Sequence, residues 1–180
     1  MDTPEARTGR DAGCSLMEQV AFGGGCHWCT EAVFHAIRGV SEVDQGFAAS
    51  LAPDDAFSEA VRVTFNPAEV ALENLVRVHL ATHASTAKHS MRGKYRSAIY
   101  CLSLSQAQQT NRIVKEITQE TGTEFVTRVL HLAGFRHSDE RFREYYKTDP
   151  ERPFCRTYID PKLALLRRNL PELLKDRVTT

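Results

Sequence analysis

The chain has few of the features that mark membrane proteins, nucleic-acid-binding proteins and disulfide-rich secreted proteins. No apolar run approaches the ~20 residues that a membrane span needs, so we expect no membrane partner. Basic and acidic residues number 23 each among 180 residues, and this balance offers no general attraction for nucleic acid. The sequence also lacks internal repeats, low-complexity tracts and linkers. These absences predict a single domain.

The cysteines are few and odd in number, unlike the paired cysteines that staple small secreted domains. They are Cys14, Cys26, Cys29, Cys101 and Cys155. This usage predicts a cytoplasmic protein in which some cysteines are structural and others take part in chemistry. The first sixteen residues are charged and lack the apolar core of a signal peptide. We therefore expect a disordered leader over 1–16 and one catalytic domain over 17–180.

A cysteine stands where a predicted strand meets a predicted helix. The strand covers 18–22, the glycines at 23–25 follow, and an apolar stripe from Cys29 to Ile37 indicates a helix. Unpaired N–H groups at the first turn of a helix stabilise a thiolate, so this position predicts a reactive Cys26. The alternative is an inert buried thiol. Cys29 is either its redox partner, at C-x-x-C spacing, or the first core position of the helix.

One acidic residue lies among apolar residues on a predicted strand. Over 57–65 the apolar residues alternate with polar ones, and Glu59 shares the apolar face. Burial of a carboxylate is costly unless it is paired or protonated, so we expect an acid that can give up a proton. The alternative is an exposed glutamate on an edge strand.

The remaining periodic segments complete a mixed α/β pattern. Strands are predicted over 40–47, 95–102 and 125–132, and helices after Asn66-Pro67, over 105–120, over 138–147 and over 161–175. The order β-α-β-β-α-β, followed by one more helix and strand, predicts an α+β fold. This fold is a two-layer ferredoxin-like (split βαβ) sheet with helices, an irregular C-terminal tail and a closing helix.

Five segments, in order along the chain, carry a family resemblance. They are Gly25-Cys26-His27-Trp28; Glu31-Ala32-Val33-Phe34 with Gly39-Val40; Ser58-Glu59-Ala60-Val61; Tyr95-Arg96-Ser97-Ala98-Ile99-Tyr100; and Pro153-Phe154-Cys155 with Ile159-Asp160-Pro161-Lys162-Leu163. Together they resemble the peptide methionine sulfoxide reductases of the A type (MsrA). The resemblance implies that fold and an oxidoreductase of the peptide-methionine (S)-S-oxide reductase kind.

The resemblance also implies roles for individual residues. The thiolate of Cys26 attacks the sulfoxide sulfur, Glu59 donates a proton, and Tyr95 donates a hydrogen bond to the departing oxygen. Cys26 is left as a sulfenic acid that Cys155 resolves, with Cys29 and Cys14 as alternative resolving thiols. The residues expected to bind the substrate are His27, Trp28 and Phe47. The family needs no bound cofactor or metal, and an external dithiol such as thioredoxin is the expected reductant.

Several departures from the family pattern predict a remodelled substrate pocket. His27 replaces a phenylalanine, and the segment between Gly46 and Glu59 lacks about a dozen residues, including a second active-site tyrosine. The family's His-Asp-Pro-Thr loop becomes His83-Ala84-Ser85-Thr86, and Ser90 stands at the position of a pocket aspartate. These changes predict a small or non-standard sulfoxide as the substrate.

Two other functions are compatible with the same residues. The first is a disulfide oxidoreductase that uses Cys26 and Cys29, and the second is a non-catalytic descendant that binds a ligand in the old pocket. A small basic cluster of Arg92, Lys94 and Arg96 is either solvated or meets an anionic substrate.

Overall fold

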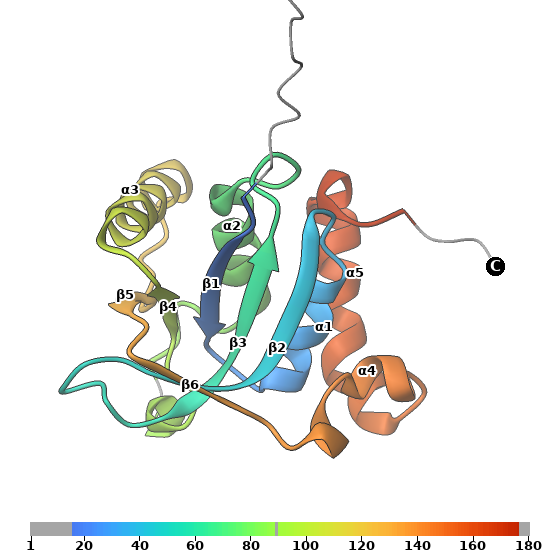
Figure 1. The fold of residues 1–180 in the computed structure, drawn as a ribbon. Coiled ribbons are helices and arrows are strands. Elements are labelled where there is room, and N and C mark those ends of the chain that lie inside the picture. The colour runs from blue at the N-terminus through green and yellow to red at the C-terminus, as the bar shows by residue number, and fades with distance from the viewer. Residues whose placement is uncertain (1–15, 89, 177–180) are drawn as a thin grey trace, which may run out of the picture.

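A central sheet with helices packed against it forms the structure, a computed structural model that describes residues 16–88 and 90–176 (Figure 1). The strands are β1 (Glu18–Gly23), β2 (Val40–Ala49), β3 (Ser58–Phe65), β4 (Ala98–Cys101), β5 (Arg128–His131) and β6 (Gly134–His137). The α-helices are α1 (His27–His35), α2 (Leu72–Thr82), α3 (Leu104–Thr121), α4 (Tyr145–Thr148) and α5 (Asp160–Asn169). Cys14 and the rest of the predicted leader up to residue 15 lie outside the described residues.

The sheet has the strand order that the split βαβ arrangement requires. Its order is β5-β4-β1-β3-β2-β6, and β1 pairs antiparallel with both β3 and β4. β2 pairs antiparallel with β3, so the four central strands carry the predicted ferredoxin-like topology. β5 extends one edge in parallel with β4, and β6 extends the other edge in antiparallel pairing with β2. The predicted fold class is confirmed.

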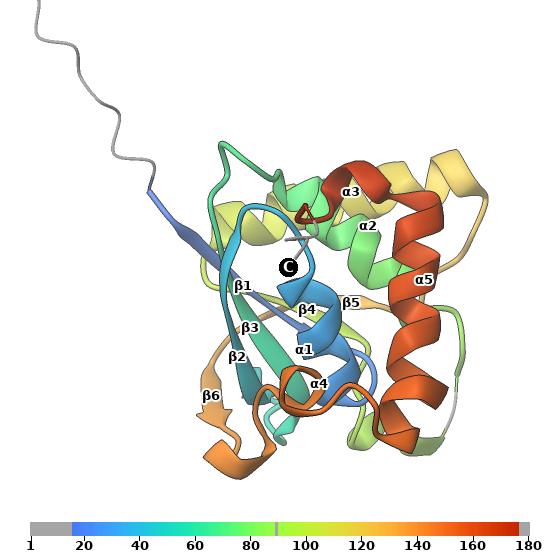
Figure 2. The same cartoon turned by 90° about the vertical axis from the view of Figure 1, so that its right-hand side faces the viewer.

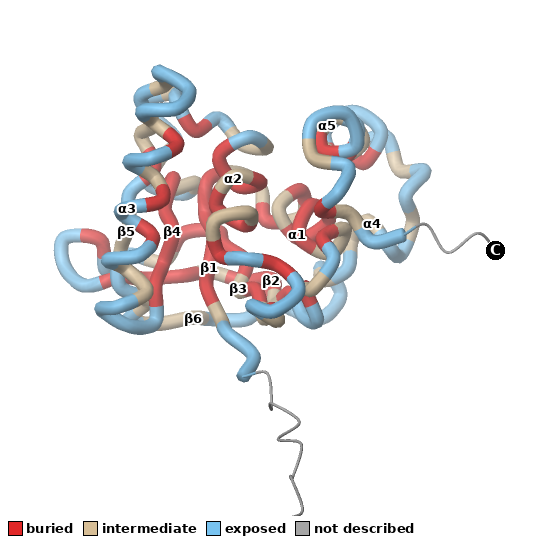
Figure 3. Tube along the Cα trace, turned by 90° about the horizontal axis from the view of Figure 1, so that it is seen from above, coloured by how far each residue is buried: buried red, intermediate tan, exposed pale blue. Residues whose placement is uncertain are grey.

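The two faces of the sheet are packed differently because their side chains alternate along each strand. The larger apolar residues, such as Val20, Phe22 and Val61, face α1, α2, α3 and α5, which lie together on one side (Figure 2). The opposite face carries small residues, such as Ala21 and Ala60, around Tyr100. Burial is concentrated in the central strands and in the helices beside them (Figure 3).

Several predicted boundaries are wrong, mostly near the C-terminus. The segment 138–147 is not one helix: a 3₁₀ turn at Glu140–Phe142 and the single turn of α4 occupy it, and β6 precedes it. Leu72, not Pro67, begins α2, since Asn66 and the residues after it form a turn. The closing helix ends at Asn169 and a π-helical turn, Cys155–Ile159, leads into it. In residues 16–88 and 90–176, no helix is long and apolar enough to cross a membrane.

Candidate functional site

Cys26 occupies the N-cap position of α1. It directly follows Gly23, which ends β1, and the two further glycines after it. Its carbonyl accepts the amides of Cys29 and Thr30, at 3.1 and 3.2 Å, which fixes the first turn of the helix. Gly24 lies against the ring of His83, and a Cβ there would collide with that ring. Gly23 is close to the carbonyls of Arg96 and Glu59. The glycines therefore allow the chain to turn between crowded loops and leave the thiol of Cys26 partly accessible.

The electrostatic surroundings of Cys26 favour its thiolate. A hydrogen bond from the Cys29 side chain lowers the pKa of Cys26, and the backbone amides of Trp28 and Cys29 act in the same direction. Burial and the nearby Glu59 carboxylate oppose this change but do not outweigh it. The same hydrogen bond, together with burial, raises the pKa of Cys29. Of the two thiols, Cys26 is therefore the more acidic, and Cys29 holds its proton more tightly.

Glu59 is buried at the start of α1, on the helix-covered face of β3 as predicted. Its Oε2 accepts the amide of His27 at 3.1 Å, so the carboxylate binds the N-terminus of the helix that carries Cys26. Lys94 Nζ lies 3.5 Å from Oε1, and the backbone amide of Glu59 donates to the Lys94 carbonyl. These contacts hold the carboxyl group within electrostatic range of Cys26.

Tyr95 precedes β4 and does not belong to it, although the sequence pattern placed it in the strand. Lys94 Nζ lies 5.0 Å from the centre of its ring and also contacts Glu59, so one lysine connects the two residues. The Tyr95 amide donates to the Met91 carbonyl at 2.9 Å. Tyr95 lines the same cavity as Cys26.

The cavity beside Cys26 has a volume of about 360 Å³, large enough for a small molecule. Its lining includes Gly24, Gly25, Cys26, Cys29, His83, Ala84, Tyr95, Phe154, Tyr158 and Lys162. The loop after α2 and the C-terminal tail, which are distant in sequence, therefore both contribute to the cavity wall. His27, Trp28 and Phe47, expected to bind substrate, are not among the described residues that line this cavity.

His27 lies on the other side of the helix start, next to Phe47. Its Nδ1 donates to the Gly46 carbonyl at 3.1 Å, which leaves Nε2 facing the Glu59 carboxylate at 3.9 Å. Its ring meets Phe47 edge to face, with centroids 5.3 Å apart. His27 thus joins β2 to the carboxyl group of Glu59.

Trp28 is covered by the C-terminal part of the chain. Its ring stacks on Tyr145 with centroids 4.2 Å apart, and Phe154 packs against it edge-on at 5.4 Å. Glu31 supports this arrangement, since its buried carboxylate accepts the amides of Glu144 and Tyr145. In this structure Trp28 anchors the tail over α1.

Cys155 belongs to this C-terminal part of the chain and is fully buried. It belongs to an apolar cluster with Cys29, Ala32 and Leu163, and Cys26 packs against this cluster. Its Sγ contacts the Asp149 carbonyl at 3.5 Å, and burial raises its pKa. Cys29 therefore hydrogen-bonds to Cys26 and shares an apolar cluster with Cys155, while Cys101 lies in the main core.

Sequence reasoning missed two residues that line the cavity with Cys26. Lys162, in the first turn of α5, donates to the Thr82 carbonyl and faces the thiol of Cys29. His83 Nε2 bonds to Ser97 Oγ at 2.8 Å, and burial lowers the pKa of His83 to about 4. The motif that contains Lys162 was visible in the sequence. The periodicity of the closing helix, however, does not indicate which of its residues faces α2.

Comparisons with known proteins identify relatives of this chain. The family described as Peptide methionine sulfoxide reductase matches residues 18–173. A peptide methionine sulfoxide reductase MsrA from Deinococcus radiodurans is 32% identical over 177 residues, covering 89% of this chain and 86% of that protein.

Solved structures of similar fold come from bacteria and yeast. Methionine sulfoxide reductase A of Corynebacterium diphtheriae has a TM-score of 0.65 and 25% identity, covering 77% of each chain. Mxr1 from Saccharomyces cerevisiae in complex with Trx2 has a TM-score of 0.55 and 19% identity, covering 69% of this chain and 83% of that one.

Proposed function

The chain belongs to the peptide methionine sulfoxide reductase family, and we propose that it reduces a methyl sulfoxide with Cys26 as the nucleophile. The observation that carries the proposal is the placement of Cys26. It stands at the start of α1, hydrogen-bonded by Cys29, with the buried Glu59 carboxyl group beside it. A nucleophilic thiol and a proton donor in one site are the two groups that oxygen transfer from a sulfoxide requires.

The first step transfers oxygen from the substrate to Cys26. The thiolate attacks the sulfoxide sulfur, the substrate leaves as a thioether, and Cys26 becomes a sulfenic acid. Glu59 supplies a proton to the sulfoxide oxygen as its bond to the substrate sulfur breaks. Tyr95 donates a hydrogen bond to the same oxygen from the wall of the cavity.

The second step removes the oxygen as water. Cys29 is the thiol already hydrogen-bonded to Cys26, so we assign it the first attack on the sulfenic acid, which forms a Cys26–Cys29 disulfide. Cys155 then attacks Cys29, because the two lie in one apolar cluster, and Cys26 is released as a thiol. Direct resolution by Cys155, which the family resemblance suggests, is the alternative order.

An external dithiol must then reduce the disulfide that involves Cys155. A thioredoxin-like protein fits this step, because thiol–disulfide exchange with a second dithiol returns both cysteines to the reduced form. The complex of Mxr1 with Trx2 supports this choice of partner.

The proposal is tested with a panel of methyl sulfoxides of both epimers, using dithiothreitol or thioredoxin as reductant. We expect reduction of the S epimer by the wild type and none by Cys26→Ser. A matched Cys101→Ser variant changes a thiol outside the site and keeps the activity. Equal rates for wild type and Cys26→Ser would overturn the proposal.

The hydrogen bond between Cys26 and Cys29 also favours a second candidate, a disulfide oxidoreductase. Such an enzyme attacks a disulfide sulfur and exchanges thiols without any oxygen transfer. Reduction of a protein disulfide by the wild type, with no sulfoxide turnover on the panel, would select this candidate over the first.

A further inference from the structure

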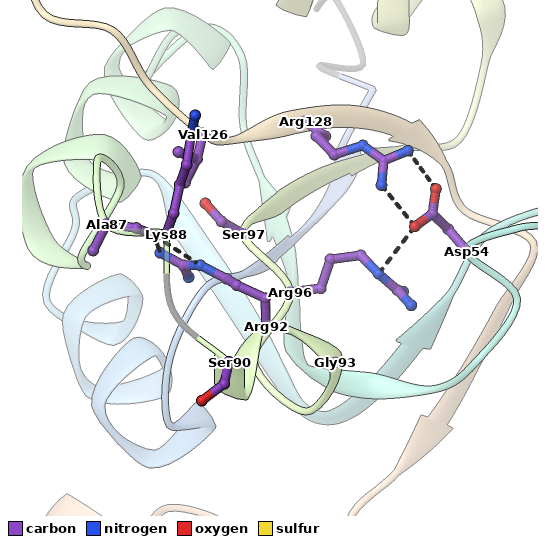
Figure 4. Close-up of a pocket in the computed structure, with 10 residues that line it drawn as sticks. All are labelled: Asp54, Ala87, Lys88, Ser90, Arg92, Gly93, Arg96, Ser97, Val126 and Arg128. Atoms are coloured by element: carbon purple, nitrogen blue, oxygen red, sulfur yellow. Dashed lines mark hydrogen bonds and ion pairs between the residues drawn. The ribbon is translucent and has the colours of Figure 1, made fainter.

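A second cavity lies next to the Cys26 cavity and is strongly basic. It has a volume of about 610 Å³ and lies between the loop after α2, the start of β5 and the turn between β2 and β3 (Figure 4). Among the described residues, its lining has four basic side chains, Lys88, Arg92, Arg96 and Arg128, and one carboxylate, Asp54. The lining therefore has a formal surplus of three positive charges.

The single carboxylate neutralises only part of this charge. Arg128 binds both oxygens of Asp54, and Arg96 Nε lies 3.4 Å from the same carboxylate (Figure 4). Arg96 also donates to the Tyr100 hydroxyl and to the Ala56 carbonyl, which fixes it in place. One negative charge thus serves two guanidinium groups, and the Arg128 side chain remains 53% exposed.

Within the part of the chain that the structure describes, the Arg92 guanidinium donates to backbone carbonyls alone. Its guanidinium donates to the carbonyls of Ala84, Ala87, Gly24 and Tyr95, and none of these carries a charge. Burial lowers the pKa of Arg92, in accord with a cation that lacks a carboxylate partner. Lys88 is exposed at the mouth and adds a further positive charge. An anion entering the cavity therefore meets a positive field.

Residues that line the basic cavity hydrogen-bond to residues that line the Cys26 cavity. Arg92, in the basic cavity, donates to Gly24 and Tyr95, which line the Cys26 cavity. Ser97, also in the basic cavity, bonds to His83 in the Cys26 cavity at 2.8 Å. The two cavities are therefore neighbours.

We propose that the basic cavity binds a carboxylate carried by the sulfoxide substrate, so that the enzyme selects acidic sulfoxides. The inference rests on the proposed function and narrows its substrate class. The attraction between the basic residues and the substrate carboxylate acts before and during the reaction. It therefore lowers KM and raises the rate at which substrate and enzyme meet.

The experiment uses three blocked peptides of equal length that contain the S epimer of methionine sulfoxide. The residue beside the sulfoxide is aspartate, asparagine or lysine, and kcat/KM is measured with dithiothreitol at low ionic strength. We expect the acidic peptide to exceed the neutral one by about fivefold to tenfold and the basic peptide to be the poorest. The preference shrinks in high salt because surface charges are screened.

Two charge-reversal variants test whether the basic cavity causes the preference for the acidic peptide. Lys88→Glu decreases the acidic-to-neutral ratio by about threefold or more, since it places a negative charge at the mouth. Lys115→Glu makes the same change of net charge on the exposed side of α3, away from the cavity, and keeps the ratio. Inorganic phosphate, added as a competing anion, raises KM for the acidic peptide only.

Other results overturn the inference. Equal kcat/KM for the acidic and neutral peptides would leave the proposed function intact and remove the substrate preference. Equal losses in Lys88→Glu and Lys115→Glu would trace the preference to net charge, and equal inhibition of all peptides by phosphate would indicate a free-anion site. Turnover of no peptide by an enzyme that reduces the methyl sulfoxides of the panel would overturn the inference alone, whereas turnover of neither would contradict the proposed function as well.

Discussion

Removal of the Cys29 thiol tests how the site activates its nucleophile. In Cys29→Ala the hydrogen bond that most lowers the pKa of Cys26 is lost, while the two backbone amides remain. A hydrogen bond to a charged group contributes about 1.5–3 kcal/mol, and a thiol is a weak donor, so the lower end applies. Since about 1.4 kcal/mol equals a factor of ten, the thiolate population at neutral pH falls about tenfold.

The assay is the rate of Cys26 alkylation by iodoacetamide at neutral pH, followed by peptide mass spectrometry. Cys29→Ser is the matched control, because its hydroxyl still donates to the thiolate although it cannot form a disulfide. We expect alkylation near the wild-type rate in Cys29→Ser and about tenfold slower in Cys29→Ala. Equal rates for Cys29→Ala and wild type would refute the role of Cys29 as donor.

Three further predictions concern the carboxyl group, the tail and pH. Glu59→Gln keeps an oxygen that accepts the His27 amide but removes the acid, so we expect kcat/KM to fall about a hundredfold or more while Tm stays unchanged. Undiminished turnover would contradict the role of Glu59 as proton donor. Trp28→Ala lowers the free energy of unfolding in urea by about 3 kcal/mol, because the stacking of Trp28 on Tyr145 is lost. A raised KM at unchanged stability would instead indicate that Trp28 contacts the substrate. Burial lowers the pKa of His79 and of His83 below their usual 6.5, so the unfolded chain binds more protons in acid. The stability they contribute is therefore present above pH 6.5 and decreases as the pH falls toward the folded value of about 4 for His83; equal urea midpoints at neutral and acidic pH would contradict this.

The central fold was predictable because its signals are local. The alternation along β3 placed Glu59 on the helix-covered face, and the glycine run after β1 located the start of α1. The C-terminal part was not predictable in the same way. The segment around α4 is held by tertiary contacts, such as those of Glu31 with the amides at 144 and 145, which leave no periodic pattern in its own sequence.

The candidate site could be proposed from motifs, but its arrangement could not. Cys26, Glu59 and Tyr95 follow from their motifs, and the structure brings them to one helix start. The stacking of Trp28 on Tyr145 and the apolar cluster that holds Cys29 and Cys155 depend on how the tail folds back. The basic cavity was visible in part, as a cluster that includes Arg92 and Arg96. The contributions of Lys88 and Arg128 come from loops that only the tertiary fold brings together.

The most direct test of the account is a single turnover without reductant, followed by intact-mass measurement. The enzyme is a Cys29→Ser/Cys155→Ser double variant, in which the thiols assigned to resolution are absent and oxygen transferred to Cys26 is retained. The account predicts thioether product in equal amount to enzyme, and one added oxygen atom that peptide mapping assigns to Cys26. Thioether formation without added oxygen on Cys26, or none with a sulfoxide that the wild type reduces, would contradict it.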